Sequence, residues 1–86
     1  DPVSVRVIEG VASRLGALGR WEPQEIGVAI RSVGKDLGVR GPALFHPVRL
    51  ALNAQESGPD LGLVMIAIGR GEVLAAYEET LGLAEL

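Results

Sequence analysis

The sequence predicts an all-α fold, a compact bundle of about five short helices. Apolar residues recur at spacings of three and four in successive segments, which is the periodicity of an amphipathic helix. Four prolines stand where they suit the first turn of a helix, because the missing N–H group has no partner there. No alternation of apolar and polar residues continues long enough to favour a β-strand. We expect one small domain over residues 1–86.

The first helix is predicted to begin at Pro2, with Asp1 as its N-cap. Gly16 and Gly19 are expected to end it. Its apolar stripe consists of Val7, Val11, Leu15 and Leu18. These spacings predict that the stripe faces the core.

The second helix is predicted to begin at Pro23, with Trp21 packing back on it as a hydrophobic staple. Gly27 and Gly34 each weaken this helix by about 1 kcal/mol relative to alanine, so packing must stabilise it. Gly38 is the expected left-handed residue at its end. The predicted buried face consists of Ile26, Ile30, Val33 and Leu37.

The third helix is predicted to be irregular. Pro42 suits a first turn, but Pro47 removes a hydrogen bond to the carbonyl of Ala43 and clashes with it. We expect a break at Pro47, either a kink or a tight turn followed by a helix that begins near His46.

Arg49 stands in the otherwise apolar run Phe45 to Leu52, and an unpaired arginine is costly to bury. Helical spacing places Leu44, Val48 and Leu52 on the core face. Phe45 and Arg49 then share a neighbouring face, rotated by about 100°. We therefore expect Arg49 to be at least partly exposed and to lack a carboxylate partner.

The fourth helix is predicted to follow a capping box formed by Ser57 and Asp60, with Pro59 in its first turn. Its apolar residues face all sides, which is typical of a central helix, so we expect it to be the most buried. They are Leu61, Leu63, Val64, Met65, Ile66 and Ile68.

The fifth helix is predicted from about Gly71 to Leu81, after a short connection at residues 69–71. We expect Glu78 and Glu79 to remain in water. The residues expected to be buried are Val73, Leu74, Tyr77 and Leu81.

Composition excludes several classes of protein. The absence of cysteine excludes disulfides, thiolate metal sites and cysteine nucleophiles. His46 is the single histidine, so no zinc site is expected, and no serine has the flanking pattern of a catalytic nucleophile. The longest apolar stretch, residues 61–69, is far shorter than the roughly 20 residues that span a bilayer. We predict no catalytic residue, no metal site, no membrane segment and a cytoplasmic location.

The charge is unevenly distributed along the chain. The formal net charge of −3 argues against a general polyanion binder. Yet four cations outnumber Asp36 within residues 31–49, whereas Arg70 alone opposes six acidic residues after residue 49. The four cations are Arg31, Lys35, Arg40 and Arg49. An anionic partner is therefore expected to meet the middle of the chain, although three scattered aromatic residues are too few for a base-stacking platform.

Several short motifs follow one another at fixed spacing. They are Trp21 and Pro23, then Leu44, Phe45, Pro47, Val48, Arg49, Ala51 and Leu52, then Pro59, Leu61, Ile68, Gly69 and Arg70. In these motifs the chain resembles the C-terminal anticodon-binding domain of bacterial-type glutamyl-tRNA synthetases, which are class I aminoacyl-tRNA synthetases. The resemblance covers most of the chain from Trp21 onward.

The resemblance implies an α-helical cage that holds the first two anticodon bases of a tRNA. It implies that Arg49 contacts the first base, and that Gly58, Pro59 and Leu61 supply the contacts from the start of the next helix. Attachment of glutamate to tRNA, with ATP and magnesium, would occur in a catalytic domain outside this chain. Because the chain begins with Asp1 rather than methionine, we expect a fragment of such a synthetase, acting as a monomer with the rest of the synthetase chain and the tRNA anticodon loop as partners.

Departures from the family pattern keep a second function open. Asn53 and Ala54 replace the family's Thr-Gly, and Gly58 stands where a polar residue is common, so the second base would meet backbone groups and Pro59. The last helix also lacks the arginines common near its end, which predicts weak RNA affinity for this fragment. The alternative is a helical protein-interaction module that kept the fold and lost RNA binding, as the acidic last third suggests.

Overall fold

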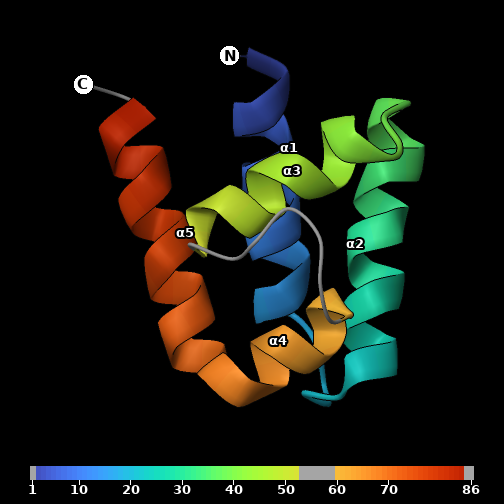
Figure 1. Ribbon diagram of the computed structural model, residues 1–86, viewed down its shortest axis with the longest axis vertical. Coiled ribbons are helices and arrows are strands. Elements are labelled where there is room, and N and C mark those ends of the chain that lie inside the picture. The colour runs from blue at the N-terminus through green and yellow to red at the C-terminus, as the bar shows by residue number, and fades with distance from the viewer. Residues whose placement is uncertain (1, 53–59, 85–86) are drawn as a thin grey trace.

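The computed structural model describes residues 2–52 and 60–84, and the side chains up to residue 82. These residues form α1 (Pro2–Gly16), α2 (Pro23–Leu37), α3 (Pro42–Ala51), α4 (Leu61–Ile68) and α5 (Arg70–Ala84), as Figure 1 shows. No β-strand occurs in the described part of the chain. The predicted all-α class is confirmed, and three helices begin at the predicted prolines Pro2, Pro23 and Pro42.

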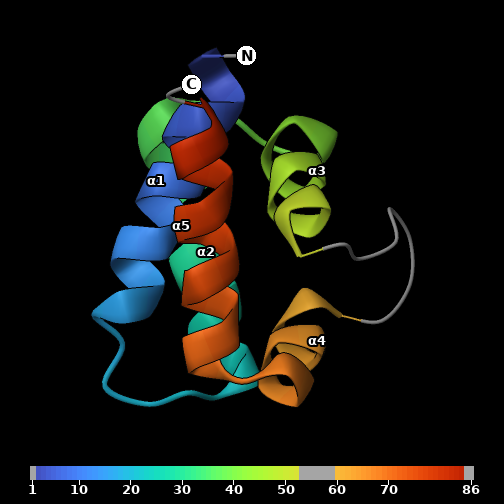
Figure 2. The same ribbon diagram turned by 90° about the vertical axis from the view of Figure 1, so that its left-hand side faces the viewer.

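The helices form two layers. α5, α1 and α2 stand side by side, and α1 runs antiparallel to both of its neighbours (Figure 1). The shorter helices α3 and α4 lie together on one face of this layer, α3 across its middle and α4 at its lower edge (Figure 2). α3 contacts α1 and α5, and α4 contacts α2 and α5. The three long helices α1, α2 and α5 thus form a base layer, and the two short helices pack against one face of it.

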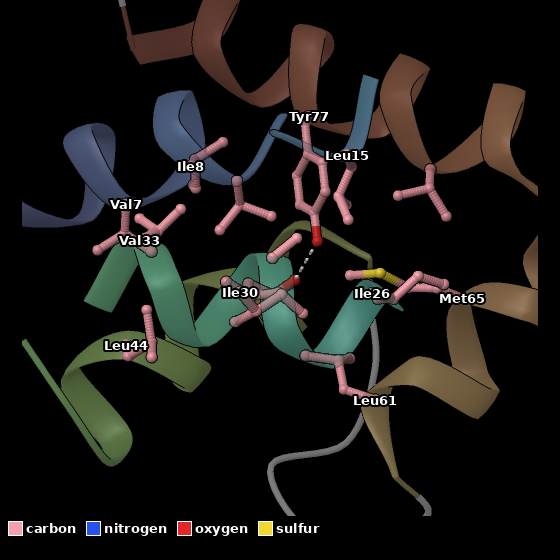
Figure 3. Packing of buried hydrophobic residues seen from close by; sticks show 14 residues of the cluster. Val7, Ile8, Leu15, Ile26, Ile30, Val33, Leu44, Leu61, Met65 and Tyr77 are labelled. Carbon is pink, nitrogen blue, oxygen red and sulfur yellow. Dashed lines mark hydrogen bonds between the residues drawn. The ribbon is translucent and has the colours of Figure 1, made fainter. Parts of the chain in front are cut away.

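Apolar residues of all five helices meet in one core between the layers (Figure 3). Its members are Val7, Ile8, Val11, Leu15, Ile26, Ala29, Ile30, Val33, Leu44, Val48, Leu61, Met65, Val73 and Tyr77. The predicted stripes therefore face the core, and Glu78 and Glu79 are exposed as predicted. The prediction for Leu37 is wrong, because this side chain lies at the open end of α2 and is 38% exposed.

Two glycines allow helices to approach closely around the N-terminus of α3 and of α4. A Cβ atom on Gly34 would lie 2.5 Å from the carbonyl oxygen of Val39 and 2.7 Å from a methyl group of Leu44. One on Gly62 would lie 2.6 Å from the carbonyl oxygen of Pro23. Gly34, which only weakens α2 as an isolated helix, is therefore needed for the tight α2–α3 connection. That connection starts at Gly38, whose φ of 69° confirms the predicted left-handed end.

α4 has the highest share of buried residues among the described helices, as predicted, but it is not covered on all sides. Met65 is fully buried and Val64 half-buried, but Leu63 is 55% exposed and Ile66 37% exposed. The reason is position, because α4 is only eight residues long and lies at the edge of the base, where α2 and α5 cover one side of it.

The start of α4 also differs from the predicted capping box. The helix begins at Leu61, and Asp60 is itself the N-cap: its Oδ1 accepts a hydrogen bond of 2.8 Å from the N–H of Gly62. Ser57 and Pro59, which the prediction placed in the cap and the first turn, lie outside the described residues. An aspartate at this position satisfies a backbone donor that has no partner within the helix.

At Pro47, the predicted alternative of a tight turn followed by a new helix is wrong, and the alternative of a kink stays a prediction. α3 runs without interruption from Pro42 to Ala51, so no second helix begins near His46. Pro47 still removes one backbone hydrogen bond, but its ring is buried and borders the same hollow as Ile8 and Ala76. Packing against α1 and α5 thus offsets a local cost that the sequence alone makes prominent.

Arg70, the first residue of α5, contacts the α1–α2 connection at the lower edge of the fold. Its guanidinium donates a 2.7 Å hydrogen bond to the carbonyl oxygen of Leu18 and lies 5.2 Å from the centre of the Trp21 ring. Cation and ring at this separation attract each other. The first turn of α5, which begins at Arg70 instead of Gly71, is thereby fixed to the α1–α2 connection. Trp21 packs against the core, as the predicted staple requires.

Candidate nucleic-acid interface

A cleft opens between α2, α3 and α4, on the side of the molecule that carries the short helices. Its volume is about 700 Å³, within the range of about 300–1,000 Å³ that is typical of small-ligand sites. The lining residues are Gly27, Ile30, Arg31, Gly41, Pro42, Phe45, His46, Arg49, Asp60, Leu61 and Gly62. The cleft therefore joins three segments that are widely separated in the sequence.

The floor and walls of the cleft are mainly apolar. Ile30 and Leu61 are core residues that close it from below, and the half-buried ring of Phe45 forms part of one wall. Gly27 and Gly41 contribute no side chain and so leave space. Such a hollow can accept a flat, partly apolar group such as a nucleobase.

Arg49 lies in the last turn of α3 and lines this cleft. It is half-buried, which confirms the prediction of partial exposure, because it sits beside Val48 but off the stripe that Leu44 and Val48 bury. That it lacks a carboxylate partner stays a prediction. A guanidinium here presents up to five N–H donors from a rigid helix.

Leu61 lines the same cleft, as predicted, although only 5% of it is exposed. Its side chain packs in the core, and only its edge borders the cleft. Gly58 and Pro59 lie outside the described residues, so their place in the site stays a prediction.

The electrostatic balance of the cleft is positive. Arg31 and Arg49 are its two arginines, and Asp60 is the one carboxylate among the described residues that line it. Asp60 accepts the N–H of Gly62 at the start of α4, where the helix dipole favours a negative charge. Its charge is thus already compensated in part.

Arg31 and Phe45 line the cleft, although the family resemblance assigns no contact to either; only the local positive charge placed Arg31 where an anion was expected. Arg31 is exposed on α2 and folds back over Gly27, where an added Cβ would lie 3.2 Å from its Nη1. A glycine four residues before an arginine is the sequence signal of this arrangement, since residues four apart share a helix face. The signal is weak alone, because the cleft exists only when α4 packs beside α2.

The described residues contain no group of three or more histidine, aspartate or glutamate side chains that could hold a metal ion. None of the described helices is long and apolar enough to cross a membrane. What the cleft offers is a set of hydrogen-bond donors over an apolar floor, which is suited to binding.

Comparison with known proteins places the chain in a family. Residues 1–81 match the anticodon binding domain family, and the chain therefore belongs to that family. No solved structure matches the chain.

Curated relatives agree with this assignment. The chain is 34% identical over 76 residues to a glutamate–tRNA ligase of Bacillus mycoides and 36% identical over 76 residues to that of Bacillus cytotoxicus. It is 38% identical over 72 residues to that of Exiguobacterium sibiricum. These matches cover 88%, 88% and 84% of this chain but only 16%, 16% and 15% of the relatives. The chain thus corresponds to a small part of each relative's length.

Proposed function

We propose that this chain is the anticodon-recognition domain of a glutamate–tRNA ligase, and that the cleft holds the first two anticodon bases. One observation carries the proposal: in a member of the anticodon binding domain family, Arg49 of α3 and Leu61 of α4 line the same positively charged cleft. The family resemblance implies both residues at the site.

Arg49 supplies the specific contact in this proposal. Bases in an anticodon loop can be unstacked, so that their edges accept hydrogen bonds and their faces meet apolar side chains. The planar guanidinium of Arg49 donates to the edge of the first base, and Phe45 and Leu61 border the space for its ring. Gly58 and Pro59 take the second base through backbone groups and packing.

The remaining functions belong to the longer protein that we propose as the parent. It attaches glutamate to tRNA in a catalytic domain outside this chain, and ATP and magnesium act there. This chain's partners are then the anticodon loop and the rest of the synthetase, in a cytoplasmic monomer.

A protein-interaction module is the second candidate, and one observation favours it. Glu72, Glu78 and Glu79 are all exposed on α5, and this acidic helix would repel RNA. In that case the partner would be a basic protein surface that docks on α5.

Titration of the 15N-labelled chain with an anticodon stem-loop at low salt separates the two candidates. We expect amide shifts concentrated at Phe45, Leu61 and Gly62, and smaller shifts with a stem-loop whose first anticodon base is changed. Equal shifts with both stem-loops would contradict base recognition. No shift in the cleft at low salt would contradict RNA binding itself and favour the interaction module.

A further inference from the structure

A second hollow adjoins the cleft along the C-terminal half of α2 and the α2–α3 connection, with a volume of about 570 Å³. We call it the basic groove; it is lined by Arg31, Gly34, Lys35, Gly38, Val39, Arg40, Gly41, Leu44 and Phe45. Arg31, Gly41 and Phe45 line both hollows, so the basic groove and the cleft are continuous.

Among the described residues that line the basic groove, all the charged ones are cations, namely Arg31, Lys35 and Arg40, and all three are exposed. Within the described residues, none of the three forms an ion pair. Asp36, next to Lys35, instead pairs with Arg14 of α1. The nearest acid along α2 is therefore engaged elsewhere, and the groove keeps its positive charge.

The backbone between these cations is open. Gly38 and Gly41 have φ angles of 69° and 64°, which strongly favour glycine, and a Cβ on either would meet nothing within 4 Å. The main chain here is thus uncovered by other side chains, and a bulky anionic chain can come close to it.

We propose that the basic groove carries the sugar-phosphate backbone of the nucleotides next to those in the cleft. This inference rests on the proposed function. Arg31, at the junction, contacts one phosphate, and Lys35 and Arg40 neutralise the next along the groove. Such contacts position a nucleic acid without reading its sequence. The cleft therefore supplies specificity and the groove supplies affinity.

The test uses the double variant Lys35→Gln/Arg40→Gln, with Arg6→Gln/Arg20→Gln as the control. The control removes the same charge from exposed residues that line neither hollow. Circular dichroism of both variants checks that the fold is kept. The dissociation constant is measured for matched and mismatched anticodon stem-loops between 50 and 200 mM salt.

We expect the groove variant to weaken binding of both stem-loops by the same factor. The slope of log K against log salt should become shallower by about 1.4, which is about 0.7 for each lost single-strand contact. The ratio of matched to mismatched affinity should stay as in the parent chain. The control should change the slope by less than half as much, because its residues lie outside the hollows.

Neutral methylphosphonate linkages placed one at a time in the stem-loop give an independent measurement. At one or two positions they should weaken binding to the parent chain but leave binding to the groove variant unchanged.

Three results would overturn the inference. A groove variant with an unchanged salt slope, in a chain where Arg49→Ala still lowers the matched-to-mismatched ratio, overturns the groove and leaves the proposed function standing. A changed ratio in the groove variant shows that these residues read bases. Absence of stem-loop binding to the parent chain at 50 mM salt overturns both proposals, and binding of a glutamate-rich peptide in its place would identify the groove as a protein site.

Discussion

The hydroxyl of Tyr77 on α5 donates a hydrogen bond to the backbone carbonyl of Val48 on α3, with 3.4 Å between the two oxygens (Figure 3). This carbonyl lies in the last turn of α3. The N–H of Leu52, four residues further on, donates to the carbonyl oxygen of Arg49 and not to that of Val48. Carbonyls at a helix end need a partner from outside the helix. Tyr77 supplies it from the core and so ties the turn that carries Arg49 to α5.

Removal of this hydroxyl should leave the fold intact but weaker. In Tyr77→Phe the buried carbonyl of Val48 loses its partner, which should lower the free energy of unfolding by about 1 kcal/mol, since the bond is long. Tyr77→Ala should lower it by about 3–5 kcal/mol, because the ring fills the core. Urea unfolding monitored by circular dichroism measures both. Equal stability of Tyr77→Phe and the parent would show that the hydrogen bond contributes nothing.

High pH should destabilise the fold through the same residue. Burial raises the pKa of the Tyr77 hydroxyl well above its usual value, because the phenolate would be desolvated. Its stabilising contribution is therefore complete below about pH 10, where an unfolded tyrosine ionises, and is lost as the pH rises further. Between about pH 10 and the raised pKa of the folded chain, the free energy of unfolding should fall by up to about 1.4 kcal/mol per pH unit more than in Tyr77→Phe.

Tyr77 is the single tyrosine, so its ionisation can be followed by absorbance at 295 nm. Phenolate absorbance should appear only together with unfolding. A titration near pH 10 in the folded chain would contradict the assigned burial.

Arg49→Ala should separate binding from folding. Arg49 lies off the core stripe, so its removal should change the free energy of unfolding by less than about 1 kcal/mol. If it makes a bidentate base contact, binding of a matched anticodon stem-loop should weaken by roughly 1–3 kcal/mol, and a mismatched one by much less. Isothermal titration calorimetry with both stem-loops measures the difference, with Arg6→Ala as the control. Equal losses for both would indicate a purely electrostatic contact, and unfolding would indicate a structural role.

Gly62→Ala should displace α4. The added Cβ would lie 2.6 Å from the carbonyl oxygen and 3.0 Å from the Cα of Pro23, and backbone atoms cannot yield as side chains do. We expect a loss of about 1–3 kcal/mol in the free energy of unfolding, together with weaker stem-loop binding. Gly71→Ala is the matched control, since its Cβ would meet nothing within 4 Å, and it should be neutral or slightly stabilising. A stable Gly62→Ala chain would mean that α2 and α4 can separate freely.

The helices were predictable where the cause is local. Pro23 begins α2 because a proline loses nothing in a first turn, and Gly38 ends it because its φ is positive. Prediction failed where packing decides. Pro47 costs α3 a hydrogen bond but gains a buried position, and hydropathy in α4 did not reveal that only one side of this helix is covered.

In the candidate site, too, features with a local cause could be predicted, and features that depend on packing could not. Arg49 could be predicted to leave the core, since helical spacing alone separates it from Val48. Arg31 could not be placed in the cleft, because Leu61 lies 30 residues further along and reaches it only through the packing of α4 on α2.

The contact between Arg70 and Trp21 provides a built-in optical probe. Trp21 is the single tryptophan, so its fluorescence reports on the lower edge of the fold alone, while Tyr77 absorbance reports on the centre of the core. In a two-state domain both signals change at the same denaturant concentration. Arg70→Met would change the fluorescence of the folded chain without moving the tyrosine signal. Two natural chromophores thus suffice to ask whether the edge that holds α4 melts with the core or before it.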